Sequence, residues 1–147
     1  FMQREDWSPA MSPAVLAHFA ETLQESYAAT LTQFVTLQTL GDANPRQLAR
    51  DLQAQIAKRP APHLDGLLQG LSWLEESDLR ADLATLRLPV QLIYGDKDTL
   101  VPLACAEWLA ERLDSAALHI VRGCGHAPQW SHTALCAEVI LAGQICH

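Results

Sequence analysis

The chain has few basic residues: 10 lysines and arginines stand against 17 aspartates and glutamates in 147 residues, a formal net charge of −7. Because proteins that bind nucleic-acid phosphates usually carry a basic excess, this balance argues against a nucleic-acid partner. The chain also has no uninterrupted apolar run near the roughly 18 to 20 residues that span a bilayer, and no charged-then-apolar signal pattern at its start. We expect a soluble, cytoplasmic protein without a membrane partner.

Cysteine clusters are absent as well. The four cysteines lie in the last third of the chain, with no CxxC pair and no zinc-like spacing: Cys105, Cys124, Cys136 and Cys146. Their even count permits two disulfides, but reduced thiols are the simpler interpretation, because a chain that is 49% hydrophobic does not need disulfide bonds to stabilise its core. Apart from His126, none of the six histidines pairs with a Cys, an acid or another His at ligand spacing, so we expect neither a metal site nor a cofactor.

Residues 12–86 have a helical pattern and almost no strand signal. Ser12-Pro13 and Asn44-Pro45 each combine an N-cap residue with proline at the first helical position. Apolar residues then recur at three- and four-residue spacing, as on the inner face of an amphipathic helix. The pattern predicts a small module of four short helices.

After residue 86 the pattern becomes that of an α/β protein. Val90 to Tyr94 is typical of a buried strand, and Leu118 to Val121 of a second strand. The segment from Leu103 to Leu113 and the segment from Thr133 to Ile145 are typical of helices. Strand, helix, strand and helix in this order predict a parallel sheet with crossover helices.

Polar residues follow both predicted strands. Asp96 and Asp98 come after the first strand, and His126 comes after the second. Parallel sheets place functional loops at the carboxyl ends of their strands, and neighbouring strands lie about 4.8 Å apart. An acid that pairs with a histidine can fix its tautomer and stabilise it when it accepts a proton from a nucleophile. We therefore expect an Asp–His pair at this edge.

The two stretches "LPVQLIYGDKDTLVP" and "IVRGCGHAPQWSH" resemble the end of an α/β-hydrolase, in which a Gly-x-x-Asp loop follows one late strand and a Gly-His loop follows the last. The family order is nucleophile, acid, histidine. The resemblance implies that Asp98 is the catalytic acid and His126 the catalytic base, and that Asp96 is a neighbouring turn residue.

The helical block is similar to the cap that many α/β-hydrolases insert before the strand that carries the acid. The resemblance implies a linker over 1–11, a helical cap over 12–86 and the C-terminal part of the core over 87–147. "FVTLQTLG", "PRQLAR" and "CGHAPQWSH" resemble the branch of biotin-pathway carboxylesterases that act on pimeloyl-acyl-carrier-protein methyl ester. Many relatives carry a glutamate five residues after the histidine; Ser131 stands there in this chain and favours that branch.

This resemblance implies a set of binding residues. The substrate-binding positions are Phe34, Val35, Thr36, Leu37, Gln38 and His126, although spacing alone fits helix packing for the cap residues equally well. Arg46 and Arg50 share one helix face and are candidates for contact with an acidic acyl carrier protein. A solvated helix face explains the two arginines as well, and Ala29 and Gln33 lack the charge that a carrier-binding relative would place there.

The chain contains no Gly-x-Ser-x-Gly motif, so the nucleophile elbow is absent, and none of the seven serines has a suitable context. We expect the cap and C-terminal portion of a serine carboxylesterase, without the N-terminal half of the sheet. Alone it should be inactive, with exposed sheet edges that bind the missing half or a second copy. Two alternatives remain: another α/β-hydrolase, such as a general carboxylesterase or a carbon–carbon bond hydrolase, or a noncatalytic interaction fragment.

Overall fold

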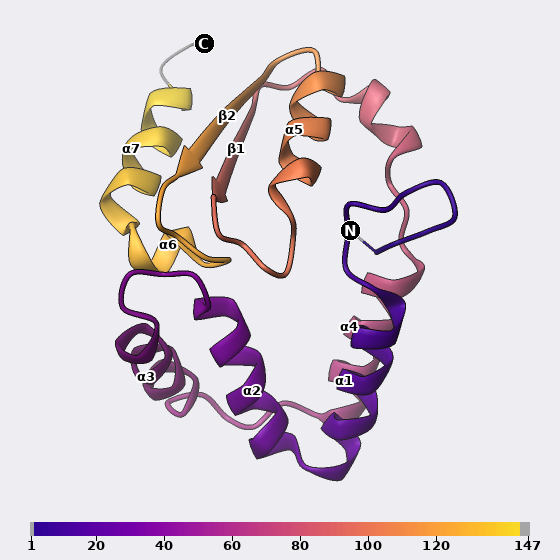
Figure 1. The fold of residues 1–147 in the computed structure, drawn as a ribbon, viewed down its shortest axis with the longest axis vertical. Helices are drawn as coiled ribbons and strands as arrows, with labels where there is room; N and C mark the ends of the chain where they lie inside the picture. The colour runs from indigo at the N-terminus through magenta and orange to yellow at the C-terminus, as the bar shows by residue number, and fades with distance from the viewer. Residues whose placement is uncertain (1, 145–147) are drawn as a thin grey trace.

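The computed structural model describes residues 2–144 and contains the predicted helical block. Its four helices are α1 (Pro13–Glu25), α2 (Tyr27–Thr39), α3 (Pro45–Ile56) and α4 (Leu64–Glu76) (Figure 1). Pro13 and Pro45 begin α1 and α3, where the missing amide hydrogen has no intrahelical partner. The predicted side-chain caps are not formed, because neither Ser12 nor Asn44 makes a capping hydrogen bond. Proline and the apolar stripe therefore suffice to start these helices.

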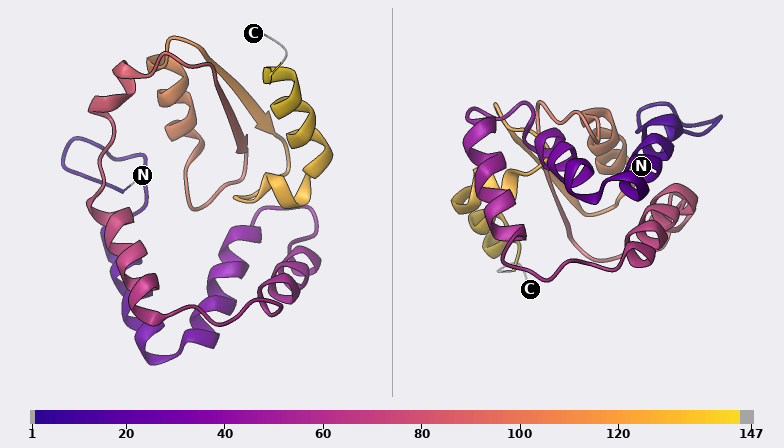
Figure 2. Two further views of the ribbon diagram at one scale, coloured as in Figure 1. Left: turned by 180° about the vertical axis from the view of Figure 1, so that it is seen from behind. Right: turned by 90° about the horizontal axis from the view of Figure 1, so that it is seen from below.

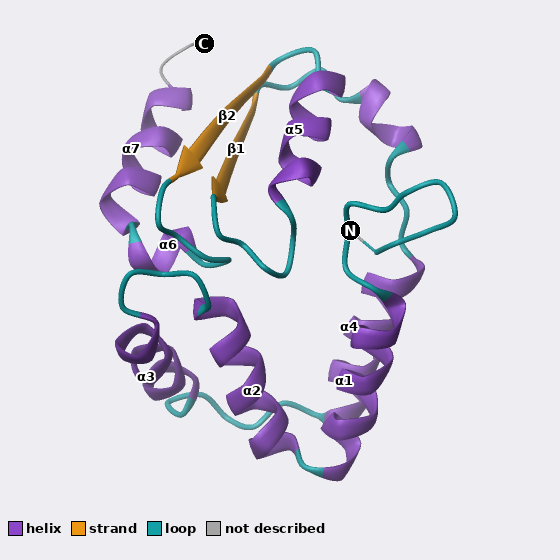
Figure 3. Ribbon diagram, viewed as in Figure 1, coloured by secondary structure: helices purple, strands orange, loops and turns teal. Residues whose placement is uncertain are grey.

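The second block contains the predicted parallel strands, β1 (Val90–Gly95) and β2 (Ala116–Val121). They are joined by α5 (Leu103–Arg112) and followed by α6 (Pro128–Ser131) and α7 (Thr133–Gln144). A 3₁₀ turn, η1 (Ala81–Thr85), precedes β1. Figure 3 shows that the strands are confined to this part of the molecule, while the rest of the fold is helix and loop. Neither η1 nor α6 was predicted.

The sheet packs against α5 through an apolar cluster. Leu92 of β1 meets Leu109 and Leu113, and all three are buried. On the side of α7, Gln91 lies beside Gly143. The prediction of a buried strand over Val90 to Tyr94 is wrong in part, since only Leu92 among these residues is buried. A sheet of two strands leaves one edge of each strand without a partner in the described part of the chain.

The cap helices extend from the carboxyl end of the sheet and form the lower half of the molecule (Figures 1 and 2). Helix α1 packs between α2 and α4, and α3 packs on α2. Several large apolar side chains stay in contact with solvent, above all Leu88 (69% exposed), Leu79 (66%) and Trp73 (64%). Within residues 2–144, no helix has the length and apolar character needed to cross a membrane.

Residues 2–11 form a loop that packs on α5. Trp7 is buried and contacts Trp108 edge-on, with 4.7 Å between ring centroids. Arg80 pairs with Asp78 at 2.7 Å and with Asp6 at 3.1 Å, which ties the loop to the segment after α4. The division into a linker, a cap and a core portion stays a prediction.

Candidate active site

The two loops with the expected acid and base begin at the same edge of the sheet. Gly95, the last residue of β1, pairs with Val121, the last residue of β2. Oδ2 of Asp98 lies 2.8 Å from Nδ1 of His126. The Asp98 side chain is 4% exposed and that of His126 34% exposed, so the carboxylate is shielded while the ring reaches open space. The parallel register thus brings the two side chains together.

The Asp98 carboxylate is held by the backbone of its own loop. Its Oδ1 accepts hydrogen bonds from the amides of Leu100 at 2.8 Å and Val101 at 2.9 Å. This arrangement fixes the rotation of the carboxylate and leaves Oδ2 directed at His126. Because the carboxylate accepts, Nδ1 of His126 carries the proton, and Nε2 keeps the lone pair that a general base needs.

Asp96 connects the two loops. Its Oδ1 accepts from the amide of Gly123 at 2.7 Å and from that of Cys124 at 3.4 Å, and the amide of Lys97 donates to the carbonyl of Cys124 at 3.0 Å. The resemblance implies only a turn residue here. In the structure the side chain also fixes the start of the loop that carries His126.

Two glycines allow the loops to approach each other. A Cβ on Gly95 would collide with the carbonyl oxygens of Cys124 and Gly125. Gly41, which follows α2, has φ +95°, and a Cβ there would lie 2.6 Å from the carbonyl oxygen of Lys97. A side chain at either position would displace a loop that holds the acid or the base.

The C-terminal end of α2 also contacts the loop of the base. The carbonyl of Gln38 accepts from the amide of His126 at 3.2 Å, and Oδ2 of Asp42 accepts from the amide of Gly125 at 3.1 Å. The cap therefore holds the backbone of Gly125 and His126 by hydrogen bonds.

A cavity of about 670 Å³ lies between the cap and the sheet, within the size range of small-molecule sites. Its apolar wall comes from stripes on three helices: Val15, Leu16, Phe19 and Leu23 on α1; Tyr27, Leu31, Phe34 and Leu37 on α2; Leu67, Leu71 and Leu74 on α4. Asp98 and His126 also line it. No serine or cysteine is among the described residues that line it.

Of the expected cap positions, only Phe34 and Leu37 line the cavity. Val35 is 2% exposed and packs inside the cap, and Thr36 is exposed, with its hydroxyl donating to a carbonyl of its own helix. Gln38 instead offers its carbonyl to His126. The reason is helical phase, because residues three apart share a face and a run of five consecutive residues does not.

Tyr94 borders the cavity near the acid. Burial, helped by the nearby Cys105 and Asp98, raises the pKa of Tyr94 to about 12. Its hydroxyl therefore stays protonated well above neutral pH.

The two arginines expected to contact a carrier protein lie on α3, away from the residues that line the cavity. Arg46 and Arg50 are exposed. Nη2 of Arg50 donates to Oε1 of Gln47 at 2.6 Å, and Gln47 in turn donates to Asp51. The arginines thus share one open helix surface with an acidic neighbour.

Sequence reasoning missed Gly41, Asp42 and Gly95 as positioning residues. Gly95 carried a local signal, since it directly follows a predicted strand, and a glycine at a strand often marks a close approach of backbone. The contacts of Gly41 and Asp42 cross from the cap to the sheet loops, and no local pattern encodes them.

Comparison with known proteins gives both a family match and close relatives. A profile described as "Alpha/beta hydrolase family" matches residues 3–139. The pimeloyl-[acyl-carrier protein] methyl ester esterase of Aromatoleum aromaticum is 42% identical over 134 residues, which cover 91% of this chain and 54% of that protein. The protein of the same name from Aeromonas hydrophila is 39% identical over 140 residues, 95% of this chain and 55% of its own length. The chain thus spans about half the length of the curated relatives it matches.

Solved structures are similar as well. Bromoperoxidase from Bacillus anthracis superposes with a TM-score of 0.86 at 20% identity, over 97% of this chain and 53% of that protein. An esterase from Exiguobacterium antarcticum gives a TM-score of 0.80 at 19% identity, over 97% of this chain and 52% of that protein. At these identities the likeness concerns the fold alone.

Proposed function

The chain belongs to the alpha/beta hydrolase family, and from this premise we propose that it supplies the acid, the base and the cap of a serine carboxylesterase. Membership of the family confirms the resemblance and the fold class predicted from the sequence. The proposed substrate is pimeloyl-acyl-carrier-protein methyl ester, which follows the names of relatives about 40% identical to the chain. The proposed nucleophile is a serine outside these 147 residues.

One observation carries the proposal: Oδ2 of Asp98 lies 2.8 Å from Nδ1 of His126, and both residues line a largely apolar cavity. A buried carboxylate that holds a half-exposed imidazole is the arrangement that activates a hydroxyl nucleophile. The elements on which the pair stands, the carboxyl ends of adjacent parallel strands, also agree with the family order of acid before histidine.

In the proposed reaction, the serine hydroxyl attacks the ester carbonyl while Nε2 of His126 takes its proton. The tetrahedral intermediate collapses as His126 returns that proton to the leaving methanol, which gives an acyl-enzyme. His126 then takes a proton from water, the resulting hydroxide attacks the acyl carbon, and the serine leaves with the proton from His126. Asp98 keeps the ring in one tautomer and stabilises its charged form throughout.

The walls of the cavity suit an acyl chain. Three helices contribute only apolar or aromatic side chains to it, and Phe19 and Phe34 meet there with 5.4 Å between their ring centroids. Burial of methylene groups against such a wall contributes about 0.8 kcal/mol each. A chain of several methylenes therefore binds far better than a short acid. Arg46 and Arg50 are proposed to contact the acidic carrier protein that bears this chain.

The 147-residue chain by itself is proposed to be inactive, since the described residues that line the cavity include no serine or cysteine. Its sheet would associate with the rest of the hydrolase core, or with a second copy, through the strand edges that lack partners. Analytical ultracentrifugation of the chain alone, compared with the chain joined to a core that carries the nucleophile, tests this association.

The test of the proposed function is methyl ester hydrolysis by the chain joined to its nucleophile-bearing core. His126→Ala and Asp98→Asn should each lower kcat by about 10³ to 10⁴-fold, since both remove the general base in its active tautomer. His63→Ala, an exposed cap histidine outside the cavity, is the matched control and should keep full activity. Hydrolysis that survives His126→Ala would refute the assignment.

The carrier contact is tested separately. Arg46→Glu with Arg50→Glu should lower kcat/KM for the carrier-bound ester and leave hydrolysis of a carrier-free pimeloyl methyl ester unchanged. Arg87→Glu provides the control, because Arg87 is 70% exposed and lies outside the cap. Equal effects of the cap and control substitutions would remove the carrier-protein proposal and leave the esterase proposal intact.

A further inference from the structure

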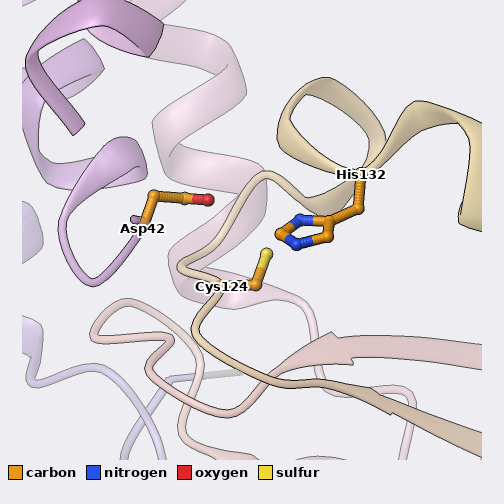
Figure 4. Close-up of side chains that lie close together, drawn as sticks. All are labelled: Asp42, Cys124 and His132. Atoms are coloured by element: carbon orange, nitrogen blue, oxygen red, sulfur yellow. The ribbon is translucent and has the colours of Figure 1, made fainter. Parts of the chain in front are cut away.

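Three residues from separate parts of the fold meet behind the loop of His126. Asp42 follows α2, Cys124 follows β2, and His132 lies between α6 and α7. Their carboxylate, thiol and imidazole ligand atoms all lie within 4.8 Å of one another. Figure 4 shows the three side chains directed toward a common point. None of them lines the cavity, so the cluster is separate from the proposed ester site.

Asp42 is the unusual member of this cluster. It is 9% exposed, and Oδ2 accepts from the amide of Gly125 at 3.1 Å. Its Oδ1 is fully buried and has no hydrogen-bond partner within the described residues. A buried carboxylate oxygen without a hydrogen-bond donor is unfavourable, and a bound cation or a proton at this oxygen would offset that cost. Figure 4 shows the carboxylate pointing at Cys124 and His132.

Cys124 has no exposed surface. This argues against a catalytic Cys–His–Asp set, because the thiol of a reactive cysteine must be accessible to its substrate. A divalent metal ion, by contrast, displaces the proton of a buried thiol when it binds.

We propose that Asp42, Cys124 and His132 form a binding site for a divalent transition metal ion of the zinc type. One thiolate and one carboxylate balance the two charges of the ion, so the buried complex is neutral. On binding, the sulfur of Cys124 forms a bond to the metal and releases its proton to solvent. Zinc sites with Cys, His and Asp ligands place these atoms about 3.5 Å apart, so the three ligand atoms, which all lie within 4.8 Å of one another, would move closer together on binding.

Ser131 supports this assignment from outside the ligand set. Its Oγ lies 2.9 Å from Nδ1 of His132 and 3.4 Å from Sγ of Cys124. When Nδ1 donates to this hydroxyl, Nε2 keeps the lone pair that a metal requires. Such outer partners fix the orientation and tautomer of metal-binding histidines. A water molecule would complete the four-coordinate site on the half-exposed side of His132 and keep the complex neutral.

The site would join the cap to the sheet. Asp42 comes from the cap, and Cys124 precedes His126 by two residues in the loop that β2 positions. A bound ion would therefore clamp the C-terminal end of α2 onto that loop. The expectation of no metal site rested on ligand spacing along the chain, which does not detect ligands from three separate segments.

Cobalt provides the direct test, because a thiolate bound to Co²⁺ gives a charge-transfer band in the near ultraviolet. The chain joined to its nucleophile-bearing core is first reduced and treated with chelator. It is then titrated with Co²⁺ and afterwards with Zn²⁺. We expect a saturable band at one equivalent of Co²⁺ that Zn²⁺ abolishes by displacement. Absence of the band in the unmodified protein overturns the proposal, and this result requires no variant to fold.

Variants identify the ligands. Cys124→Ser should abolish the band, whereas Cys105→Ser should keep it, although Cys105 is equally buried. Ser131→Ala should keep the band and weaken Co²⁺ binding by about tenfold. Far-ultraviolet circular dichroism checks that each variant is folded. A band that survives in folded Cys124→Ser, or disappears in Cys105→Ser, overturns the assignment. Neither result depends on ester hydrolysis, so failure of the metal site and failure of the proposed function are distinguishable.

Discussion

Gly41→Ala is the most informative single substitution at the junction of the cap and the sheet. Gly41 has φ +95°, and an alanine held in a left-handed conformation costs about 1–2 kcal/mol. The new Cβ would also lie 2.6 Å from the carbonyl oxygen of Lys97 and 2.7 Å from its Cβ. To reach 3.0 Å the two loops must separate by about 0.4 Å or more, and forced packing of this kind costs about 1–3 kcal/mol. The expected loss of unfolding free energy is about 2–5 kcal/mol.

Substitutions at two other glycines separate the cost of the left-handed backbone from the cost of the steric overlap with Lys97. Gly123 has φ +68° with nothing within 4 Å of a built Cβ, so Gly123→Ala should cost only the conformational strain of about 1–2 kcal/mol. Gly66 lies in α4 with nothing within 4 Å, so Gly66→Ala should stabilise the protein by about 0.5–1 kcal/mol. Urea unfolding followed by circular dichroism should rank Gly66→Ala above the unmodified protein, then Gly123→Ala, then Gly41→Ala.

The same glycine substitutions also test the effect of this junction on ester hydrolysis. Lys97 precedes Asp98, so its displacement by Gly41→Ala should disturb the acid, and kcat for ester hydrolysis should fall by about tenfold. Gly66→Ala should leave kcat unchanged. If Gly41→Ala is no less stable than Gly123→Ala, the close approach of the cap to Lys97 is absent and the reasoning fails.

Asp96→Ala should destabilise the protein by about 1–3 kcal/mol in urea, because two backbone amides lose their acceptor; an effect below about 0.5 kcal/mol would contradict its role between the loops. Hydrogen bonding to Arg80 lowers the pKa of Asp78 from its ordinary value of 3.8, so this pair stabilises the fold fully above that pH and less as the pH falls below it. Urea unfolding at a series of acidic pH values should show that loss of stability, and Asp78→Asn should remove this pH dependence. Cys124 is fully buried and burial raises the pKa of its thiol, so iodoacetamide should label it at neutral pH only after denaturation; rapid labelling of the folded protein would show that the thiol is accessible.

Much of the fold could be predicted from periodicity alone. The four cap helices and both strands follow from apolar spacing and from proline at the helix starts, and the structure contains them. The two elements that were missed, η1 (Ala81–Thr85) and α6 (Pro128–Ser131), span five and four residues. Elements this short contain little more than one turn, so they are too short to show an apolar repeat in the sequence.

Some residues of the candidate site could also be predicted from the sequence, and others could not. Asp98 and His126 could be brought together in prediction because strand ends in a parallel sheet share one edge. The cap residues were carried over as a continuous stretch, whereas a helix presents every third or fourth residue, so Val35 and Thr36 do not line the cavity. Asp42 could not be found at all, since its contact with Gly125 depends on where the cap docks.

That docking gives the cap a second role besides forming a wall. Within α2, Leu37 lines the cavity, and the carbonyl of the next residue, Gln38, accepts from the amide of His126. The loop after the helix continues the contact, with Gly41 against Lys97. Leu37 and Gln38 stand on the same turn of α2, so an acyl chain bound as proposed would pack against the turn that holds the amide of His126. We therefore expect a change in the acyl chain at Leu37 to alter the position of the imidazole.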